Sequence, residues 1–150
     1  TYTPMAGQTG VSNVTVTISD GVFADDAHCS FTITVQNSPD AMADDFTTPD
    51  DIDITRDDLF VTNASGVDDL GFPAGPITHF GVVSLGGSVT DNTEGSTVAL
   101  AGGTLQVKAN GRISLTGQPF TPGTYTFEYR LANAVGSDDA TVTIEINEGP

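Results

Sequence analysis

The start and the end of the chain resemble each other, and this internal repeat constrains the fold more than any other feature. When Gly10 is placed on Gly123, the two segments align without a gap through the alternating run that follows. After a slip of two residues, Phe31 aligns with Val142. A period of about 110 residues indicates an array of similar units, each large enough to be a domain.

The repeat predicts two unequal parts. Residues 1–39 correspond to the C-terminal strands of a preceding, incomplete repeat, and residues 40–150 to a complete domain. Pro39 marks the boundary, because proline has no N–H to donate to a strand ladder. Two strands cannot bury a core alone, so they need strands from preceding residues, from another chain or from the complete domain. We favour preceding residues in a longer protein, because the complete domain contains its own copy of these strands.

Short runs of strict alternation predict half-buried β-strands. In each run apolar residues alternate with Thr, Glu or Arg, and no segment sustains a helical period. Asn110-Gly111 lies between two runs, and because both residues tolerate positive φ we expect a tight hairpin turn. The fold class is therefore all-β, with about eight strands forming an antiparallel two-sheet sandwich over residues 40–150. The residues expected to face its core are Tyr125, Phe127, Tyr129, Val142, Ile144 and Ile146.

The charge of the chain excludes two classes of partner. It carries 20 acidic and 4 basic residues, a formal net charge of −16. Such a surface repels nucleic acid and anionic membranes, because both are bound through Lys and Arg. It attracts divalent cations instead. No apolar run approaches the length of a membrane span, so we expect neither nucleic-acid binding nor membrane insertion.

Four segments resemble known repeats. Residues 1–21 contain Tyr-x-Pro, a glycine, an alternating strand and Asp-Gly, in the order of the closing half of bacterial cadherin-like or Ig-like tandem repeats. Residues 38–45, with Pro, Ala and paired Asp, resemble their inter-repeat junction, and residues 120–127 their closing motif. The chain is thus similar to repeats of large extracellular, adhesin-type proteins. Leu59-Phe60 and Asn63 resemble a further segment of the family, in which Asp follows, but here Ala64 does.

The resemblance implies a setting and a role. It implies an antiparallel Ig-like or cadherin-like sandwich in a tandem array, located outside the cell or on the bacterial cell surface. Such domains serve as spacers and can bind calcium, and their partners are neighbouring repeats or protomers of the same protein. The departure at Ala64 argues against carrying over a metal ligand at Asn63.

Paired aspartates provide candidate calcium ligands. Calcium takes about six to eight oxygen ligands, several of them carboxylates. The junction offers Asp40, Asp44 and Asp45 where the strand ends of two domains converge, so an ion bound there would stiffen the hinge. The alternative is that the acidic pairs are solvated turns. The pairs are 25–26, 44–45, 50–51, 57–58, 68–69 and 138–139.

The remaining reactive side chains are few. Cys29 is the single cysteine, so no internal disulfide forms, and it is either a small, partly buried residue at a strand entry or part of an intermolecular bridge. His28 and His79 are the two histidines, and a zinc site would need more His or Cys nearby. We expect both to be ordinary surface or loop residues.

Three functions are compatible with the sequence. The first is a non-enzymatic spacer module of an extracellular bacterial repeat protein, stiffened by calcium if the junction binds it. The second is a subunit of an extracellular filament that assembles through its strand-rich ends. The third is a carbohydrate-binding accessory domain of a secreted enzyme, which needs a stripe of exposed aromatic residues. Most of the 3 Tyr and 8 Phe stand at inward strand positions, which disfavours the third.

Overall fold

The computed structural model describes residues 1–21, 27–56, 59–61 and 64–150. Over these residues the expectation of an all-β chain is confirmed, and the one helical element among them is the 3₁₀ turn η1 (Val83–Leu85). No helix in this part of the chain has the length and apolar character needed to cross a membrane. The strands are β1 (Gly10–Ile18), β2 (Ala27–Val35), β3 (Asp44–Pro49), β4 (Ile54–Arg56), β5 (Ile77–Gly81), β6 (Asn92–Thr93), β7 (Thr97–Leu100), β8 (Gly103–Val107), β9 (Ile113–Thr116), β10 (Gly123–Ala132) and β11 (Ser137–Asn147).

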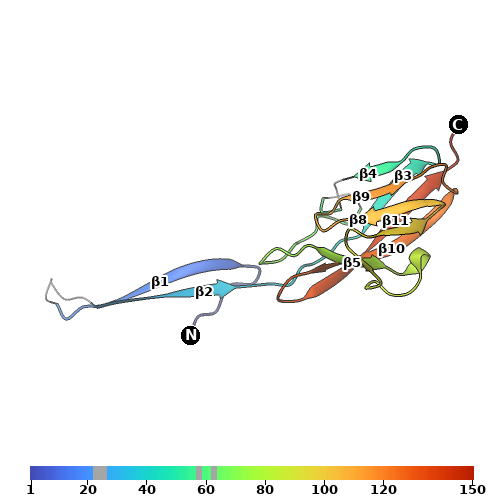
Figure 1. Cartoon of the computed structure of the whole chain (residues 1–150). Helices are drawn as coiled ribbons and strands as arrows, with labels where there is room; N and C mark the ends of the chain where they lie inside the picture. Colours follow the sequence, from blue (N-terminus) through green and yellow to red (C-terminus); the bar gives the residue numbers. More distant parts are fainter. Residues whose placement is uncertain (22–26, 57–58, 62–63) are drawn as a thin grey trace.

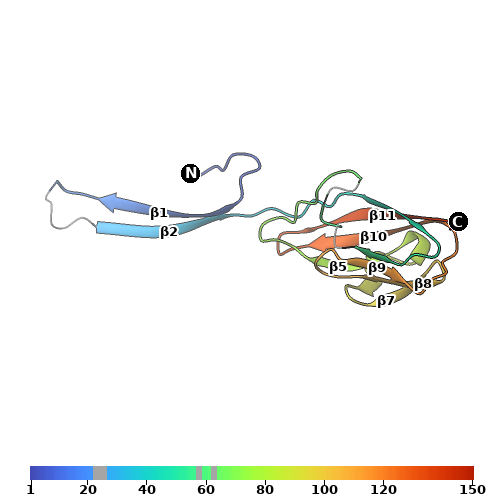
Figure 2. The same ribbon diagram turned by 90° about the horizontal axis from the view of Figure 1, so that it is seen from above.

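Strands β1 and β2 form a two-stranded antiparallel sheet of their own, which projects from the rest of the molecule (Figures 1 and 2). Alternation gives this hairpin a polar and an apolar face. Polar partners hydrogen-bond across the strands, with Thr15 Oγ1 lying 3.1 Å from Ser30 Oγ and Thr17 Oγ1 3.0 Å from His28 Nδ1. Because the hairpin projects from the sandwich (Figures 1 and 2), the complete domain does not cover it. Of the three expected sources of covering strands, preceding residues and another chain remain.

The other strands form two sheets packed face to face as a β-sandwich. The five-stranded sheet has the order β3-β11-β10-β5-β6, and the four-stranded sheet the order β4-β9-β8-β7. Phe127 and Tyr129 from the first sheet and Leu105 from the second are completely buried in the shared core. Of the inward positions expected from alternation, five are buried and Tyr125 is half-buried against the core.

One pairing corrects the expectation of a wholly antiparallel sandwich. Strand β3 pairs with β11 in parallel, from Asp44 opposite Val142 to Pro49 opposite Asn147. Both strands begin at the end of the sandwich where the chain arrives from the hairpin, so they run in the same direction (Figure 1). The first sheet is therefore mixed, because its other pairs are antiparallel. After β3 the chain crosses to β4 in the other sheet.

The tight hairpin turn expected at Asn110-Gly111 is present between β8 and β9, and its hydrogen bonds give its type. Lys108 N–H donates to Arg112 O (2.9 Å), and Gly111 N–H donates to Lys108 O (3.0 Å). Gly111 alone of the pair takes positive φ, 81°, so this is a three-residue loop with a bulge and not a two-residue turn. A Cβ at Gly111 would lie 3.0 Å from the Phe60 ring, which packs over the turn.

The Phe127 ring tests the core. It is completely buried and meets Phe80 edge to face, with ring centroids 6.3 Å apart. Phe127→Ala should lower the free energy of unfolding by about 3–5 kcal/mol, because it removes a buried ring and leaves a cavity. Phe31→Ala is the matched control, because that ring is 49% exposed. Denaturant unfolding followed by circular dichroism measures both, and equal costs would contradict the proposed core.

Candidate functional site at the junction of hairpin and sandwich

The segment that joins β2 to β3 is anchored to the sandwich by paired backbone hydrogen bonds. Asn37 and Phe72 exchange two N–H to carbonyl bonds, each 3.2 Å long. Asp40 and Asp69 exchange two more, of 2.8 and 2.9 Å. We call residues 36–43 the linker. The loop at 69–72 thus acts as a short antiparallel partner, and the linker is held at two points.

Asn133, at the turn between β10 and β11, adds a side-chain clamp. Its Nδ2 donates to the Asn37 carbonyl and to the Pro73 carbonyl, both at 2.8 Å. Its Oδ1 accepts from Val135 N–H at 2.9 Å and Gly136 N–H at 3.1 Å. One amide therefore ties the linker, the 69–73 loop and the β10–β11 turn together.

Gly71 is required where the linker crosses the 69–72 loop. Its φ of +76° is rarely adopted by other residues. A Cβ there would lie 2.6 Å from Asn133 Nδ2, 2.8 Å from Asn37 O and 2.9 Å from Pro39 N. Two of these are linker backbone atoms, so any side chain at Gly71 would push the linker away.

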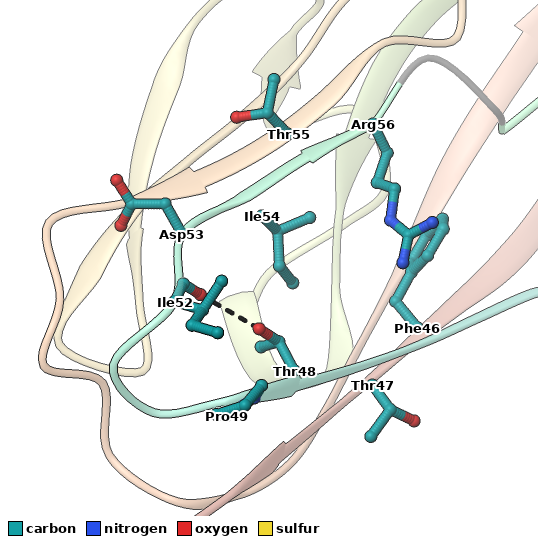
Figure 3. A pocket seen from close by; sticks show the side chains of 9 residues that line it. All are labelled: Phe46, Thr47, Thr48, Pro49, Ile52, Asp53, Ile54, Thr55 and Arg56. Atoms are coloured by element: carbon teal, nitrogen blue, oxygen red, sulfur yellow. Dashed lines mark hydrogen bonds between the residues drawn. The ribbon is translucent and has the colours of Figure 1, made fainter. Parts of the chain in front are cut away.

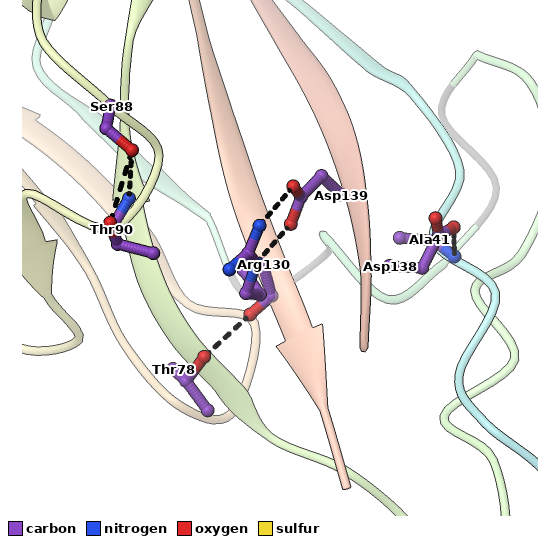
Figure 4. A network of polar contacts seen from close by, with 7 residues as sticks. All are labelled: Ala41, Thr78, Ser88, Thr90, Arg130, Asp138 and Asp139. Atoms are coloured by element: carbon purple, nitrogen blue, oxygen red, sulfur yellow. Dashed lines mark hydrogen bonds and ion pairs between the residues drawn. The ribbon is translucent and has the colours of Figure 1, made fainter. Parts of the chain in front are cut away.

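Three aspartates accept hydrogen bonds from the linker. Asp138 Oδ2 accepts from Ala41 N–H at 2.9 Å, and Figure 4 shows the two facing each other. Asp68 Oδ1 accepts from Met42 N–H at 2.6 Å. Asp69 Oδ2 accepts from Asn37 Nδ2 at 3.2 Å. Sequence reasoning marked 68–69 and 138–139 only as acidic pairs, because nothing local shows that they meet the linker.

Asp68 and Tyr129 form a buried polar pair beneath the linker. Tyr129 is completely buried, and its hydroxyl donates to Asp68 Oδ2 at 2.7 Å with Met42 O as an alternative acceptor at 3.0 Å. Burial raises the pKa of Asp68, the bonds from Met42 and Tyr129 lower it, and the charges of Asp40 and Asp138 raise it further. Burial, followed by the bond to Asp68, raises the pKa of Tyr129, which keeps the phenol protonated as a donor.

The three aspartates proposed as calcium ligands do not share one face. Asp40 is exposed, Asp44 is 1% exposed, and Asp45 is exposed. Asp44 and Asp45 are consecutive in β3, so their side chains point to opposite faces of the sheet. Across the described parts of the chain, no group of three His, Cys, Asp or Glu side chains is placed to hold a metal ion. Asp25-Asp26, Asp57-Asp58 and Asn63 lie outside the described residues.

An ion pair lies on the outer face of the five-stranded sheet, away from the linker. Arg130 on β10 makes a bidentate ion pair with Asp139 on β11, with both N to O distances 2.7 Å (Figure 4). The hydrogen bond to Asp139 raises the pKa of Arg130. The pair lies on the outer face and is about one-third exposed at Arg130 (31%). Its net contribution to stability is therefore small, about 0–1 kcal/mol.

An open groove of about 240 Å³ lies between the edge strands β3 and β4 (Figure 3). Its floor contains Phe46, and the Arg56 guanidinium lies 5.8 Å from the centre of that ring. Thr48 Oγ1 donates to Ile52 O at 3.0 Å across the groove. Asp53, at its rim, accepts from Gly117 N–H at 3.2 Å. The polar groups of the groove thus make contacts within the fold. The linker has more hydrogen-bonded contacts, so we take it as the candidate functional site.

Asp68 gives the unfolding equilibrium a pH dependence. Its pKa is raised in the folded state, so its proton stabilises that state fully below the unfolded pKa of about 3.9. This stabilisation is lost as pH rises through the folded pKa. Asp68→Asn should therefore gain stability relative to wild type as pH rises from about 4 to 7, because the amide bears no charge and can still accept from Met42. Denaturant titrations at several pH values measure the difference.

Asp45→Asn is the control for this experiment, since Asp45 is exposed. It removes the same charge from an exposed position, so the pH dependence that Asp68→Asn shows beyond Asp45→Asn is the part that the burial of Asp68 causes. An equal pH dependence in the two variants would contradict a raised pKa at Asp68.

Two comparisons with known proteins give no match on which a function could be based. A scan against protein-family models finds no match. A search of curated proteins also finds none. The resemblance to cadherin-like and Ig-like repeats therefore remains an expectation from the sequence motifs.

Proposed function

We propose that the chain is a non-enzymatic spacer module of an extracellular bacterial repeat protein, in which similar units follow one another head to tail. The observation that carries this proposal is the path of the chain. It enters the sandwich from the hairpin at one end and leaves at the opposite end, where the C-terminus lies (Figure 1). Units joined in this way extend the array with each repeat.

The anchoring of the linker supports a stiff array. Four backbone bonds, at Asn37 and Asp40, and the side-chain bonds of Asn133, Asp68 and Asp138 restrain the segment. A net gain of about 0.5–1.5 kcal/mol for each such bond opposes bending at the joint. A spacer needs this property, because a freely jointed chain would not hold a distal domain away from a cell.

The recurrence of the hairpin supports the tandem arrangement. In the first hairpin Gly10 pairs with Val35, and in the second Gly123 pairs with Ile146. The sequence alignment places Gly10 on Gly123 before the two-residue slip and Val35 on Ile146 after it. The residues that are paired in one hairpin are thus aligned with the residues that are paired in the other. The two hairpins therefore have the same strand register. A net charge of −16 also favours extension, since neighbouring units repel each other.

A filament subunit is the second candidate. The observation that favours it is the exposed apolar surface of the hairpin, where Phe31 is 49% and Ile18 69% exposed. Protomers that assemble through this surface would associate as concentration rises. Sedimentation velocity over a range of concentrations separates the two, because a spacer unit stays monomeric when its apolar face is not self-complementary.

Stiffness at the joint is tested by the distance between two spin labels, one on Cys29 and one on a Thr104→Cys substitution in β8. The chain with this substitution alone should give a narrow distance distribution by pulsed electron resonance. Adding Gly71→Ala should broaden it, because the added Cβ collides with linker atoms. Gly95→Ala is the control, since Gly95 has nearly the same φ, +77°, with nothing within 4 Å of the added Cβ. A broad distribution without either glycine change would contradict the spacer proposal.

Calcium at the junction forms the second part of the proposal. The charges of Asp40 and Asp138 act on the buried Asp68 carboxylate, so a cation nearby would relieve repulsion. We expect millimolar calcium to raise the melting temperature relative to chelator, by an amount equivalent to about 2.7 kcal/mol at a hundredfold excess over Kd. The charge of Asp44 acts on Tyr129, the partner of Asp68, whereas Asp45 is exposed on the opposite face of β3. Asp44→Asn should therefore abolish the rise, and Asp45→Asn should leave it. A rise that survives Asp44→Asn would place the ion elsewhere.

A further inference from the structure

The apolar face of the β1–β2 hairpin is uncovered. Val16 is 45%, Ile18 69% and Phe31 49% exposed, and Tyr2, ahead of the hairpin, is 58% exposed. A two-stranded sheet is at best marginally stable by itself in water. The clustering of these side chains on one face of one sheet therefore points to a partner.

The buried hairpin of the sandwich identifies what such a face packs against. In the first hairpin Val14 pairs with Phe31, and at the same position of the second Phe127 pairs with Val142. Each cross-strand pair consists of one Phe and one Val, but the strand that carries the Phe differs between the two hairpins. The two pairs therefore have the same apolar volume, although the residue type differs at each position.

Neighbouring positions agree on both faces. The inward pair Val16 and Cys29 takes the place of Tyr129 and Ala140, which are 0% and 7% exposed. On the outer face, the hydrogen-bonded pair Thr17 and His28 takes the place of the ion pair between Arg130 and Asp139. The matching register therefore holds for buried and for exposed positions.

The residues ahead of the hairpin continue the match. When Gly10 is placed on Gly123, Thr1-Tyr2-Thr3 fall on Ser114-Leu115-Thr116 of β9. Leu115 is completely buried in the sandwich core. The exposed Tyr2 thus stands at the position of a core residue, on a strand of the opposite sheet.

We propose that the apolar face of the β1–β2 hairpin is an interaction surface for a unit of the same chemistry as residues 40–113 of this chain. This partner supplies the strands equivalent to β3 through β8, and Thr1-Tyr2-Thr3 completes the strand equivalent to β9. Strand β1 then pairs antiparallel, as β10 pairs with β5, and β2 parallel, as β11 pairs with β3. The inference rests on the proposed repeat function and names the partner of the hairpin.

A second copy of the chain fits this face less well. Two hairpins packed face to face would leave the outer edges of all four strands without ladder partners, which is the usual liability of open sheets. The sandwich of a second copy offers no place either, because its own β10–β11 hairpin already lies between β3 and β5 and packs against the four-stranded sheet. The partner is therefore a unit that lacks its own closing hairpin.

Cys29 reports on the proposal, because it is the single thiol of the chain. We compare the full chain with a fusion in which a copy of residues 40–113 precedes Thr1, which adds no cysteine. The rate of Cys29 reaction with an aromatic disulfide reagent is measured under native conditions. Cys29 should react rapidly in the full chain, where it is exposed, and at least about tenfold more slowly in the fusion, where reaction requires opening of the new core.

Two variants of the fusion provide the matched comparison. Phe31→Asp places a charge on the apolar face and should restore rapid reaction. Thr32→Asp places it on the outer face, where Thr32 Oγ1 donates to Asn13 Oδ1 at 3.0 Å, and should leave Cys29 protected. Protection lost in both variants would attribute the effect to charge alone and would overturn the proposed face.

Further outcomes decide between partners. Rapid reaction of Cys29 in the fusion, while the 40–150 unit keeps its amide protection, would overturn the proposal. Protection in the full chain that grows with concentration, together with a dimeric mass, would assign the face to a second copy and overturn it as well. A failure of the spacer function is distinct from these, since it appears as a broad distribution of the distance between the two spin labels in the full chain.

Discussion

The burial of one face of the β10–β11 hairpin is the interaction on which the rest of the structure depends. Phe127 and Tyr129 on β10 and Val142 and Ile144 on β11 are completely buried against the opposite sheet. Burying an aliphatic or aromatic side chain contributes about 1.5–3 kcal/mol, and ordering each residue of backbone costs about 1–2 kcal/mol. Two strands alone cannot meet this cost. The chain contains the same hairpin register twice, buried once and uncovered once, so the two copies show what the covering layer supplies.

The junction follows from the same hairpin. The β10–β11 turn carries Asn133 and the start of β11 carries Asp138, and both side chains bind linker backbone atoms. The buried Tyr129 places its hydroxyl on Asp68, which accepts from Met42 N–H. The core thus positions the polar groups that hold the linker, and the stiffness of the joint depends on the stability of the sandwich. Acidic residues that would otherwise repel are used here as acceptors for backbone N–H groups.

Much of the fold could be predicted from the sequence, because strand faces obey a local period of two. Alternation placed Phe127 and Val142 in the core, and it placed the turn at Asn110-Gly111. It did not reveal that β3 runs parallel to β11, because strand direction depends on where the chain enters the sandwich. The candidate site was predicted only in part. The junction was located, but the contacts of Asp68 and Asp138 with the linker bring together residues far apart in sequence.

The sequence by itself determined the β-class, the inward positions and the equivalence of the two hairpins, since each is a property of residues a few positions apart or of direct repetition. Only the tertiary structure decided which acids meet the linker, why Gly71 tolerates no side chain, and that Asp44 and Asp45 face opposite sides of one strand. The physical reason is that burial and hydrogen bonding depend on distances across the fold. Local pattern fixes which face of a strand a side chain occupies, and packing decides what that face meets.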